Sequence, residues 1–150
     1  MATRTVTVSS ILPASADRIW NRLMRLETLQ YIAAPYAAFA PVDQDRGLVW
    51  KEGETTRLRL HLFGFMPLGL HTIHVCRFDR ETYSVYTEEN SRALPVWNHS
   101  ISIVPLGEEK ARYTDEVTIG AGFMTGVVSL WGTLFFRHRQ RKWKRLLSGK

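Results

Sequence analysis

The chain has 150 residues, 45% hydrophobic and 23% charged, which suits one globular domain spanning residues 1–150 and excludes a disordered or multidomain protein. Its single cysteine, Cys76, excludes an internal disulfide framework and a multi-thiolate zinc site, and it indicates a reducing, cytoplasmic compartment. The net charge of +6 comes from the C-terminal segment, because seven of the 20 Lys and Arg residues lie in 137–150 and no acid follows Glu116, which argues against a nucleic-acid-binding fold.

The N-terminal part of the sequence predicts one strand followed by two short helices. Thr3–Ile11 alternates small polar with apolar residues and is rich in Thr and Val, as strands are. Ser15 then occupies the position of a helix N-cap. The first helix is indicated by apolar residues at helical spacing: Ile19, Leu23 and Leu26. A second short helix is predicted over Leu29–Ala34.

The middle of the sequence predicts five strands joined by short turns. In residues 56–63, Leu58, Leu60 and Leu62 alternate with polar side chains, which is the pattern of a half-buried strand. Strands are predicted over residues 56–63, 70–78, 82–89, 96–104 and 112–119. Consecutive strands with short connections form an antiparallel meander.

One long helix is predicted at the C-terminal end, over Met124–Leu147, about 36 Å in length. An alternative comes from Val117–Phe136, which carries no charge over 20 residues and precedes a basic run, as a transmembrane helix would. Its first residues, however, complete a strand alternation, and its Thr, Ser and Gly residues lower its hydrophobicity. A helix lying over an apolar cavity is therefore preferred to a membrane span.

The order of these elements indicates an α+β protein. A curved antiparallel β-sheet leaves one face bare, and the long helix is the element able to cover it. The prediction is a helix-grip fold, in which the sheet wraps around the long C-terminal helix and two short helices follow the first strand.

Three stretches resemble the START-like superfamily, also called the polyketide cyclase/dehydrase and lipid transport, SRPBCC or Bet v 1-like group. ILPASADRIWNRLMRLETLQYIAAPYAAF resembles the first strand, the two short helices and the return into the sheet. WNHSISIV with YTDEVTI resembles its paired strands, and FFRHRQRKWKRLL the end of its long helix. The resemblance implies a cavity between sheet and helix. Because its members range from lipid carriers to cyclases, fold alone does not decide function.

His99 and Asp115 are the central candidates for a site. If the turn between their strands is centred near Gly107, the residue opposite His99 has a number close to 115, and the parity of each strand turns both side chains to the apolar side. A buried carboxylate needs a partner, which the imidazole could supply. The pair could anchor a ligand, act as a general base with its carboxylate, or form a structural hydrogen bond.

The same strand parity, together with the helical spacing of the C-terminal segment, predicts the other residues of the site. The candidate catalytic residues are His99, Asp115 and Tyr113. The predicted ligand-binding residues are Trp97, His99, Ile101, Tyr113, Asp115, Val117, Trp131 and Phe135. The aromatic members among them also suit plain core packing.

Metal and cofactor chemistry find no support in the sequence. His71 and His74 lie three apart on a predicted strand, so they should face opposite sides of the sheet. Cys76 is expected to be a small buried hydrophobe rather than a nucleophile. Motifs for nucleotide or dinucleotide binding are lacking, and neither a metal nor a cofactor is predicted.

The basic run at the end of the long helix suits anionic lipid headgroups, and a solvated helix end that complements the helix dipole is the alternative. Its predicted membrane- or anion-contact residues are Arg137, Arg139, Arg141, Lys142, Trp143, Lys144 and Arg145. Because the sequence shows no second basic surface, an anionic lipid is preferred to nucleic acid as the partner of this run.

Three functions follow. The first is a cytoplasmic protein that binds or transports a hydrophobic small molecule or lipid, with peripheral contact to an anionic membrane. The second is an aromatase/cyclase-like or dehydratase-like enzyme that uses His99 as base, Asp115 to orient it and Tyr113 as donor. The third is a module that binds a membrane or partner through the basic helix. Binding ranks ahead of catalysis.

Overall fold

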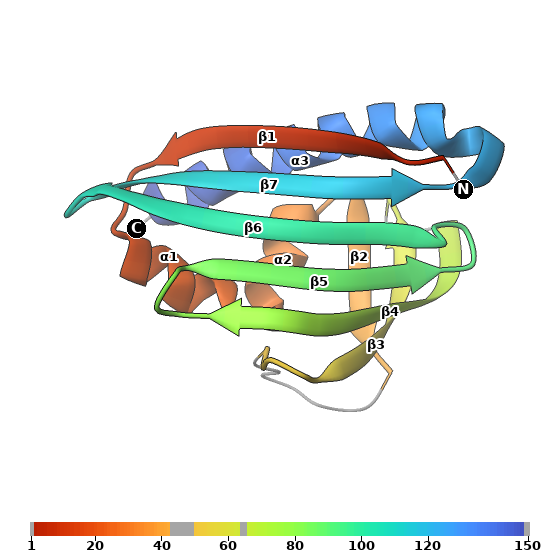
Figure 1. The fold of residues 1–150 in the computed structure, drawn as a ribbon, viewed down its shortest axis with the longest axis horizontal. Helices are drawn as coiled ribbons and strands as arrows, with labels where there is room; N and C mark the ends of the chain where they lie inside the picture. The colour runs from red at the N-terminus through yellow and green to blue at the C-terminus, as the bar shows by residue number, and fades with distance from the viewer. Residues whose placement is uncertain (1, 43–49, 64–65, 149–150) are drawn as a thin grey trace.

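The computed structural model describes residues 2–42, 50–63 and 66–148, and these residues form a seven-stranded antiparallel sheet with helices on one side (Figure 1). The strand order across the sheet is β1-β7-β6-β5-β4-β3-β2. The strands are β1 (Arg4–Leu12), β2 (Ala37–Pro41), β3 (Thr55–Leu62), β4 (Met66–Asp79), β5 (Ser84–Ser91), β6 (Val96–Gly107) and β7 (Lys110–Gly120).

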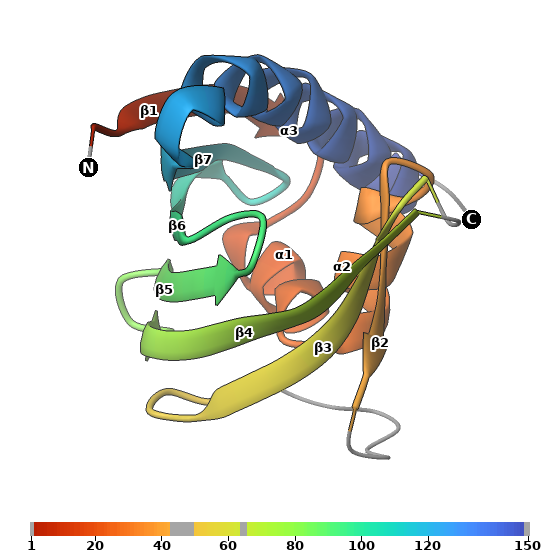
Figure 2. The same ribbon diagram turned by 90° about the vertical axis from the view of Figure 1, so that its right-hand side faces the viewer.

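The long C-terminal helix lies across the open side of the curled sheet, as Figure 2 shows. The helical elements are α1 (Ala16–Leu23), α2 (Leu26–Ala33), the short 3-10 helix η1 (Gly122–Met124) and α3 (Thr125–Ser148). α3 packs against β1, β7 and α2. At the start of α1, the backbone N–H of Arg18 donates to Ser15 Oγ at 3.1 Å, which is the predicted N-cap. The α+β helix-grip prediction is confirmed.

Three elements differ from the sequence prediction. The first helix ends at Leu23, so Leu26, which the helical spacing assigned to it, belongs to α2 instead. The second helix begins at Leu26 rather than Leu29, because Arg25 adopts extended backbone between the two helices. β2 is not predicted by the residue pattern, since its sequence AAFAP is small and apolar without alternation. It pairs with β3 from Ala37 opposite Leu62 to Pro41 opposite Leu58.

The uncharged stretch Val117–Phe136 is not one helix. Its first residues belong to β7, which ends at Gly120, and α3 begins only at Thr125 after the turn of η1. The transmembrane alternative is therefore wrong for this stretch. Among the described residues, we find no helix that is both long and apolar enough to cross a membrane.

The core is divided along α3. One cluster joins the carboxyl end of α3 to α1 and includes Trp20, Tyr113 and Trp143. A second cluster joins the middle of α3 to the centre of the sheet and includes Trp97 and Phe136. A cavity lies between these clusters and the strands β3, β4 and β5.

Candidate functional site

A cavity of about 410 Å³ lies between the concave face of the sheet and the helices α2 and α3. Five of the predicted ligand-binding residues line it: Trp97, His99, Ile101, Trp131 and Phe135. The other three, Tyr113, Asp115 and Val117, are buried on β7 but are not part of its wall. Most of the remaining wall is aliphatic or aromatic, and its volume falls in the usual range for small-molecule pockets, roughly 300–1,000 Å³.

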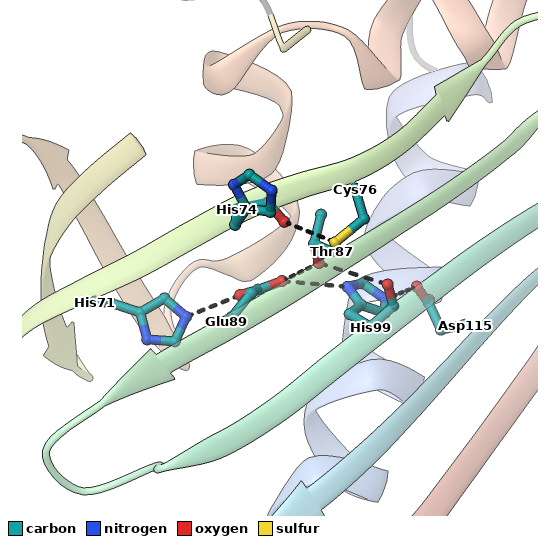
Figure 3. A network of polar contacts seen from close by, with 7 residues as sticks. All are labelled: His71, His74, Cys76, Thr87, Glu89, His99 and Asp115. Atoms are coloured by element: carbon teal, nitrogen blue, oxygen red, sulfur yellow. Dashed lines mark hydrogen bonds and ion pairs between the residues drawn. The ribbon is translucent and has the colours of Figure 1, made fainter. Parts of the chain in front are cut away.

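A polar strip crosses four neighbouring strands beside this cavity (Figure 3). His71 Nε2 on β4 donates to Glu89 Oε1 on β5 at 2.8 Å, and Thr87 Oγ1 donates to Glu89 Oε2 at 2.6 Å. His99 on β6 places Nδ1 4.0 Å from Glu89 Oε2 and Nε2 2.7 Å from Asp115 Oδ1 on β7. The strip therefore alternates histidines with carboxylates across the sheet.

The contact between His99 and Asp115 forms across a diagonal rather than between directly opposite residues. His99 is opposite Val117, and Asp115 is opposite Ile101, so the predicted register is displaced by two residues. A shift of two keeps both side chains on the same face of the sheet, which is why they still meet. Gln140 on α3 donates to Asp115 Oδ2 at 3.1 Å and to the carbonyl oxygen of Val8 at 2.7 Å.

Both carboxylates of the strip are held in the ionised form. Burial raises the pKa of Asp115, but the hydrogen bond from His99, the charges of Arg139 and His99, and the hydrogen bond from Gln140 outweigh it, so the pKa lies below its ordinary value. Burial likewise raises the pKa of Glu89, and the hydrogen bond and charge of His71 are the largest of the opposing effects that leave it lowered. The strip thus places two ionised carboxylates in contact with histidines beside an apolar wall.

The helical repeat turns two of the predicted membrane-contact residues inward. Arg139 is 4% exposed and lines the cavity, while Trp143 is fully buried against Tyr113. They follow Gly132 and Phe135/Phe136 at intervals of three or four residues, which is the inner face of α3. These two residues therefore cannot contact a lipid surface, and that part of the prediction is wrong.

The other members of the basic run remain at least partly accessible. Lys142 is half-buried, where its Nζ donates to the carbonyl oxygen of Ala34 at 3.2 Å and lies 4.2 Å from the centre of the Tyr31 ring. The exposed members are Arg137, Arg141, Lys144 and Arg145.

Tyr113 lies away from the position that an enolate donor would need. Burial, and then the negative charge of Asp115, raise the pKa of its phenol. Its hydroxyl is enclosed near the side chains of Arg139 and Trp143, and its ring packs on Trp143, 5.4 Å between centroids. Because it does not line the cavity, the predicted catalytic role of Tyr113 is not supported by its position.

Cys76 is exposed, so the prediction of a buried hydrophobe is wrong. The pairing of β4 with β5 skips this residue between Val75 and Arg77, and such a bulge interrupts the alternation of the strand. His71 lines the cavity, while His74 lies outside it with Nδ1 2.7 Å from Thr55 Oγ1. Within the described parts of the chain, no three His, Cys, Asp or Glu side chains are grouped as a metal ion would require.

Sequence reasoning missed the polar residues of β4 and β5. Thr87 and Glu89 share the strand parity of the buried Val85, and His71 shares that of the buried Ile73. Strand parity could therefore have found them, as it found His99. The charge of Glu89 and its place near a strand end made it resemble an exposed residue.

Comparison with known proteins identifies the fold and the family. A search of curated proteins found no matching sequence. A START superfamily protein from Mycobacterium smegmatis is 15% identical, with a TM-score of 0.71 over 95% of this chain and 96% of that one. Truncated norcoclaurine synthase from Thalictrum flavum is 14% identical, with a TM-score of 0.74 over 99% and 96%. The same enzyme in complex with dopamine and hydroxybenzaldehyde is 16% identical, with a TM-score of 0.68 over 99% and 89%.

These likenesses show that the fold is that of START-like, Bet v 1-like proteins, as the sequence resemblance predicted. The match to a family model covers most of the chain. Residues 10–147 match the model described as Domain of unknown function (DUF8410), and the chain therefore belongs to that family.

Proposed function

We propose that this protein binds a hydrophobic small molecule or lipid in the cavity between its sheet and α3. The observation that carries the proposal is a mainly apolar wall with few polar side chains, most of which belong to the strip on β4, β5 and β6. Small-molecule sites have this composition, because apolar area supplies affinity and a few fixed polar groups supply orientation. Trp97, Trp131 and Phe135 would cover the apolar part of the ligand, and His99 would face its polar part.

The solved structures of the same fold support a role with small molecules. Norcoclaurine synthase, which shares this fold, has been solved in complex with two small aromatic molecules, dopamine and hydroxybenzaldehyde. That enzyme is only 16% identical to this chain, so its reaction is not carried over.

The geometry favours binding over base catalysis by His99. Its Nε2 is already 2.7 Å from Asp115 Oδ1, and its Nδ1 faces Glu89 Oε2 at 4.0 Å. Both ring nitrogens thus face carboxylates, whereas a general base needs a free nitrogen aimed at the substrate. Catalysis by His99 would also predict that His99→Ala abolishes turnover and spares binding.

Native mass spectrometry of protein purified without detergent tests the binding proposal, with an organic extract of the same sample analysed in parallel. We expect a reproducible added mass that recurs in the extract. If the protein is empty and takes up no hydrophobic fluorophore, the cavity does not bind ligands and the proposal is wrong.

A pair of matched variants links any bound ligand to the cavity. Val128 lines the cavity on α3, so Val128→Trp should fill the space and lower the affinity for the fluorophore at least tenfold. Val104 is 48% exposed on β6 and outside the cavity wall, so Val104→Trp should leave the affinity unchanged. Equal effects of the two substitutions would place the ligand elsewhere.

We also propose that α3 docks the protein on an anionic membrane, because its solvent-facing ridge has two different halves. The first half is apolar, with the exposed side chains Val127, Leu130 and Leu134, and the exposed Phe123 of η1 precedes them. They follow at intervals of three or four residues, and the same ridge continues into the exposed cations Arg137, Arg141 and Lys144. Anionic lipids attract such cations, and the acyl region accepts the apolar side chains.

Vesicle flotation tests the docking proposal. The protein should bind vesicles that contain phosphatidylserine, bind pure phosphatidylcholine vesicles less, and lose binding in high salt. Replacing Leu130 and Leu134, which lie outside the cavity wall, with Gln should reduce binding, while Leu106→Gln, an exposed apolar position on β6, should not. Binding that is unaffected by Leu130→Gln with Leu134→Gln, or absent altogether, would contradict docking through this ridge.

A further inference from the structure

Arg139 is a buried cation that forms no ion pair with a carboxylate in the described part of the protein. It is 4% exposed and lines the cavity, and the polar group that its side chain approaches is the Tyr113 hydroxyl, which carries no charge to balance it. Its Nε is enclosed and without a hydrogen-bond partner. Taking a guanidinium out of water is costly unless an anion and good hydrogen bonds compensate. This donor group is therefore incomplete as it stands.

Two aromatic rings compensate for part of that cost. The Cζ atom of Arg139 lies 5.1 Å from the centre of the Phe136 ring and 5.7 Å from that of Phe135. Such cation–π contacts stabilise the charge but leave the N–H groups without acceptors. The rings thus hold the guanidinium in place without using its hydrogen bonds.

The nearby carboxylates are already occupied by other donors. Glu89 accepts from His71 and Thr87, and Asp115 accepts from His99 and Gln140. Asp115 forms no ion pair with Arg139, although the positive charge of Arg139 contributes to lowering the pKa of that carboxyl. The five donors of a guanidinium are arranged as a planar fork, which matches a carboxylate in two parallel hydrogen bonds.

The position of Arg139 also defines which end of a ligand it would meet. The wall contributed by α3 runs from Val127 through Trp131 to Arg139, a distance of about 18 Å along the helix, and Met124 of η1 extends the wall beyond Val127. Met124 and Ala93 are exposed members of the wall and mark its open side near the start of α3. Arg139 is therefore at the inner end, where its neighbour Phe136 also contacts His99, 4.9 Å between ring centroids.

We propose that the ligand is an amphipathic carboxylate that enters polar end first, places its carboxylate on Arg139 beside His99 and leaves its apolar body toward Met124. This rests on the proposed binding function and names the class of ligand. A singly charged carboxylate suits the site better than a dianionic phosphate, because Arg139 is the one Arg or Lys side chain among the described residues that line the wall. Trp131 and Phe135 stack at 4.8 Å between centroids and provide a flat apolar wall for the body.

Titrations with dodecanoate and with uncharged 1-dodecanol, monitored by tryptophan fluorescence, distinguish the contribution of the carboxylate to the affinity from that of the alkyl chain. We expect wild-type protein to bind dodecanoate at least about tenfold more tightly, since hydrogen bonds between charged groups contribute more than neutral ones. In Arg139→Gln the two affinities should converge through loss of dodecanoate binding, with dodecanol affinity unchanged. Arg112→Gln, an exposed arginine on β7 outside both the cavity wall and the docking ridge, should keep the wild-type preference.

The wild-type comparison stands even if Arg139→Gln fails to fold, and Arg139→Lys, which keeps the charge but not the fork, should show an intermediate preference. Equal affinity of wild-type protein for the two probes would overturn the carboxylate proposal and leave the binding function intact. A preference that survives Arg139→Gln would also overturn it. Failure to bind either probe would overturn the proposal together with the binding function on which it rests.

Discussion

Asp115 is the side chain whose charge the interior depends on most directly. It is 1% exposed, and its two oxygens accept hydrogen bonds from His99 and Gln140. Asp115→Asn keeps the shape but removes the negative charge that faces His99 and Arg139. We expect the free energy of unfolding at pH 7 to fall by about 3–5 kcal/mol, as when one partner of a buried pair is removed. Urea denaturation measures it.

Glu116 provides the matched control for this substitution, because it is the adjacent residue of β7 but points to solvent. Glu116→Gln should change the free energy of unfolding by no more than about 0.5 kcal/mol. Comparable losses in the two variants would mean that the charge of Asp115 is not specifically needed.

The effect of Asp115→Asn should depend on pH in one direction. The pKa of Asp115 is lowered in the folded protein from the value of 3.8 that it has without these interactions. Because its pKa is lower in the folded state, Asp115 stabilises the protein at pH values above its unfolded-state pKa. This stabilisation is lost as the pH falls through the folded-state pKa. The difference in unfolding free energy between wild type and Asp115→Asn should shrink as the pH falls below about 4. A difference that grows on acidification would contradict the ionised state of Asp115.

At the scale of elements, α3 lies on the sheet at the distance that Gly132 allows. A Cβ atom at this position would meet Ile119 Cδ1 at 3.1 Å and Trp97 Cη2 at 3.7 Å. Gly126, earlier in the same helix, has only the Arg4 side chain at 4.0 Å. Gly126→Ala should therefore stabilise the protein by about 0.5–1 kcal/mol through helix propensity. Gly132→Ala should lose that gain and lower the melting temperature.

Thermal unfolding of the two variants checks this difference, and near-ultraviolet circular dichroism reports whether Trp97 moves. Only Gly132→Ala should alter the aromatic spectrum, since Trp97 belongs to the cluster against which α3 packs. If both substitutions stabilise equally, Ile119 yields without strain and Gly132 does not set the spacing of helix and sheet.

Periodicity predicted the elements and the faces of several strands, but not the contacts that cross between elements. Strand parity placed His99 and Asp115 on one face, and the two-residue displacement of their register left that face unchanged. Parity failed at Cys76, because a bulge depends on the pairing of two strands and not on the pattern of one.

For α3, the basic composition gave no indication of which residues face the sheet. Arg139 and Trp143 lie on the same inner face as Phe135 and Phe136, but the charges around them suggested a solvated helix end. The sequence therefore assigned both residues to a docking surface, whereas the structure places Arg139 in the cavity wall and Trp143 in the core beside Tyr113. Only the packing of α3 on the sheet separates the buried cation from its exposed neighbours.

At the scale of the whole molecule, the curled sheet and α3 enclose more space than their own side chains fill, and this divides the five tryptophans into two groups. Trp50, Trp97 and Trp131 line the cavity, whereas Trp20 and Trp143 pack in the cluster beneath α1. A brominated hydrophobic ligand quenches indole fluorescence on contact, so 1-bromonaphthalene should quench the first group and spare the second.

Removing one group at a time makes this prediction specific. In a variant with Trp20→Phe and Trp143→Phe, the quenched fraction at saturation should rise, because the unquenched emission is removed. With Trp97→Phe and Trp131→Phe, the quenched fraction should fall while Trp20 and Trp143 still emit. Saturable quenching that is the same in both variants would mean that the ligand does not enter the space between sheet and helix, and that the enclosed volume is a packing feature of the fold.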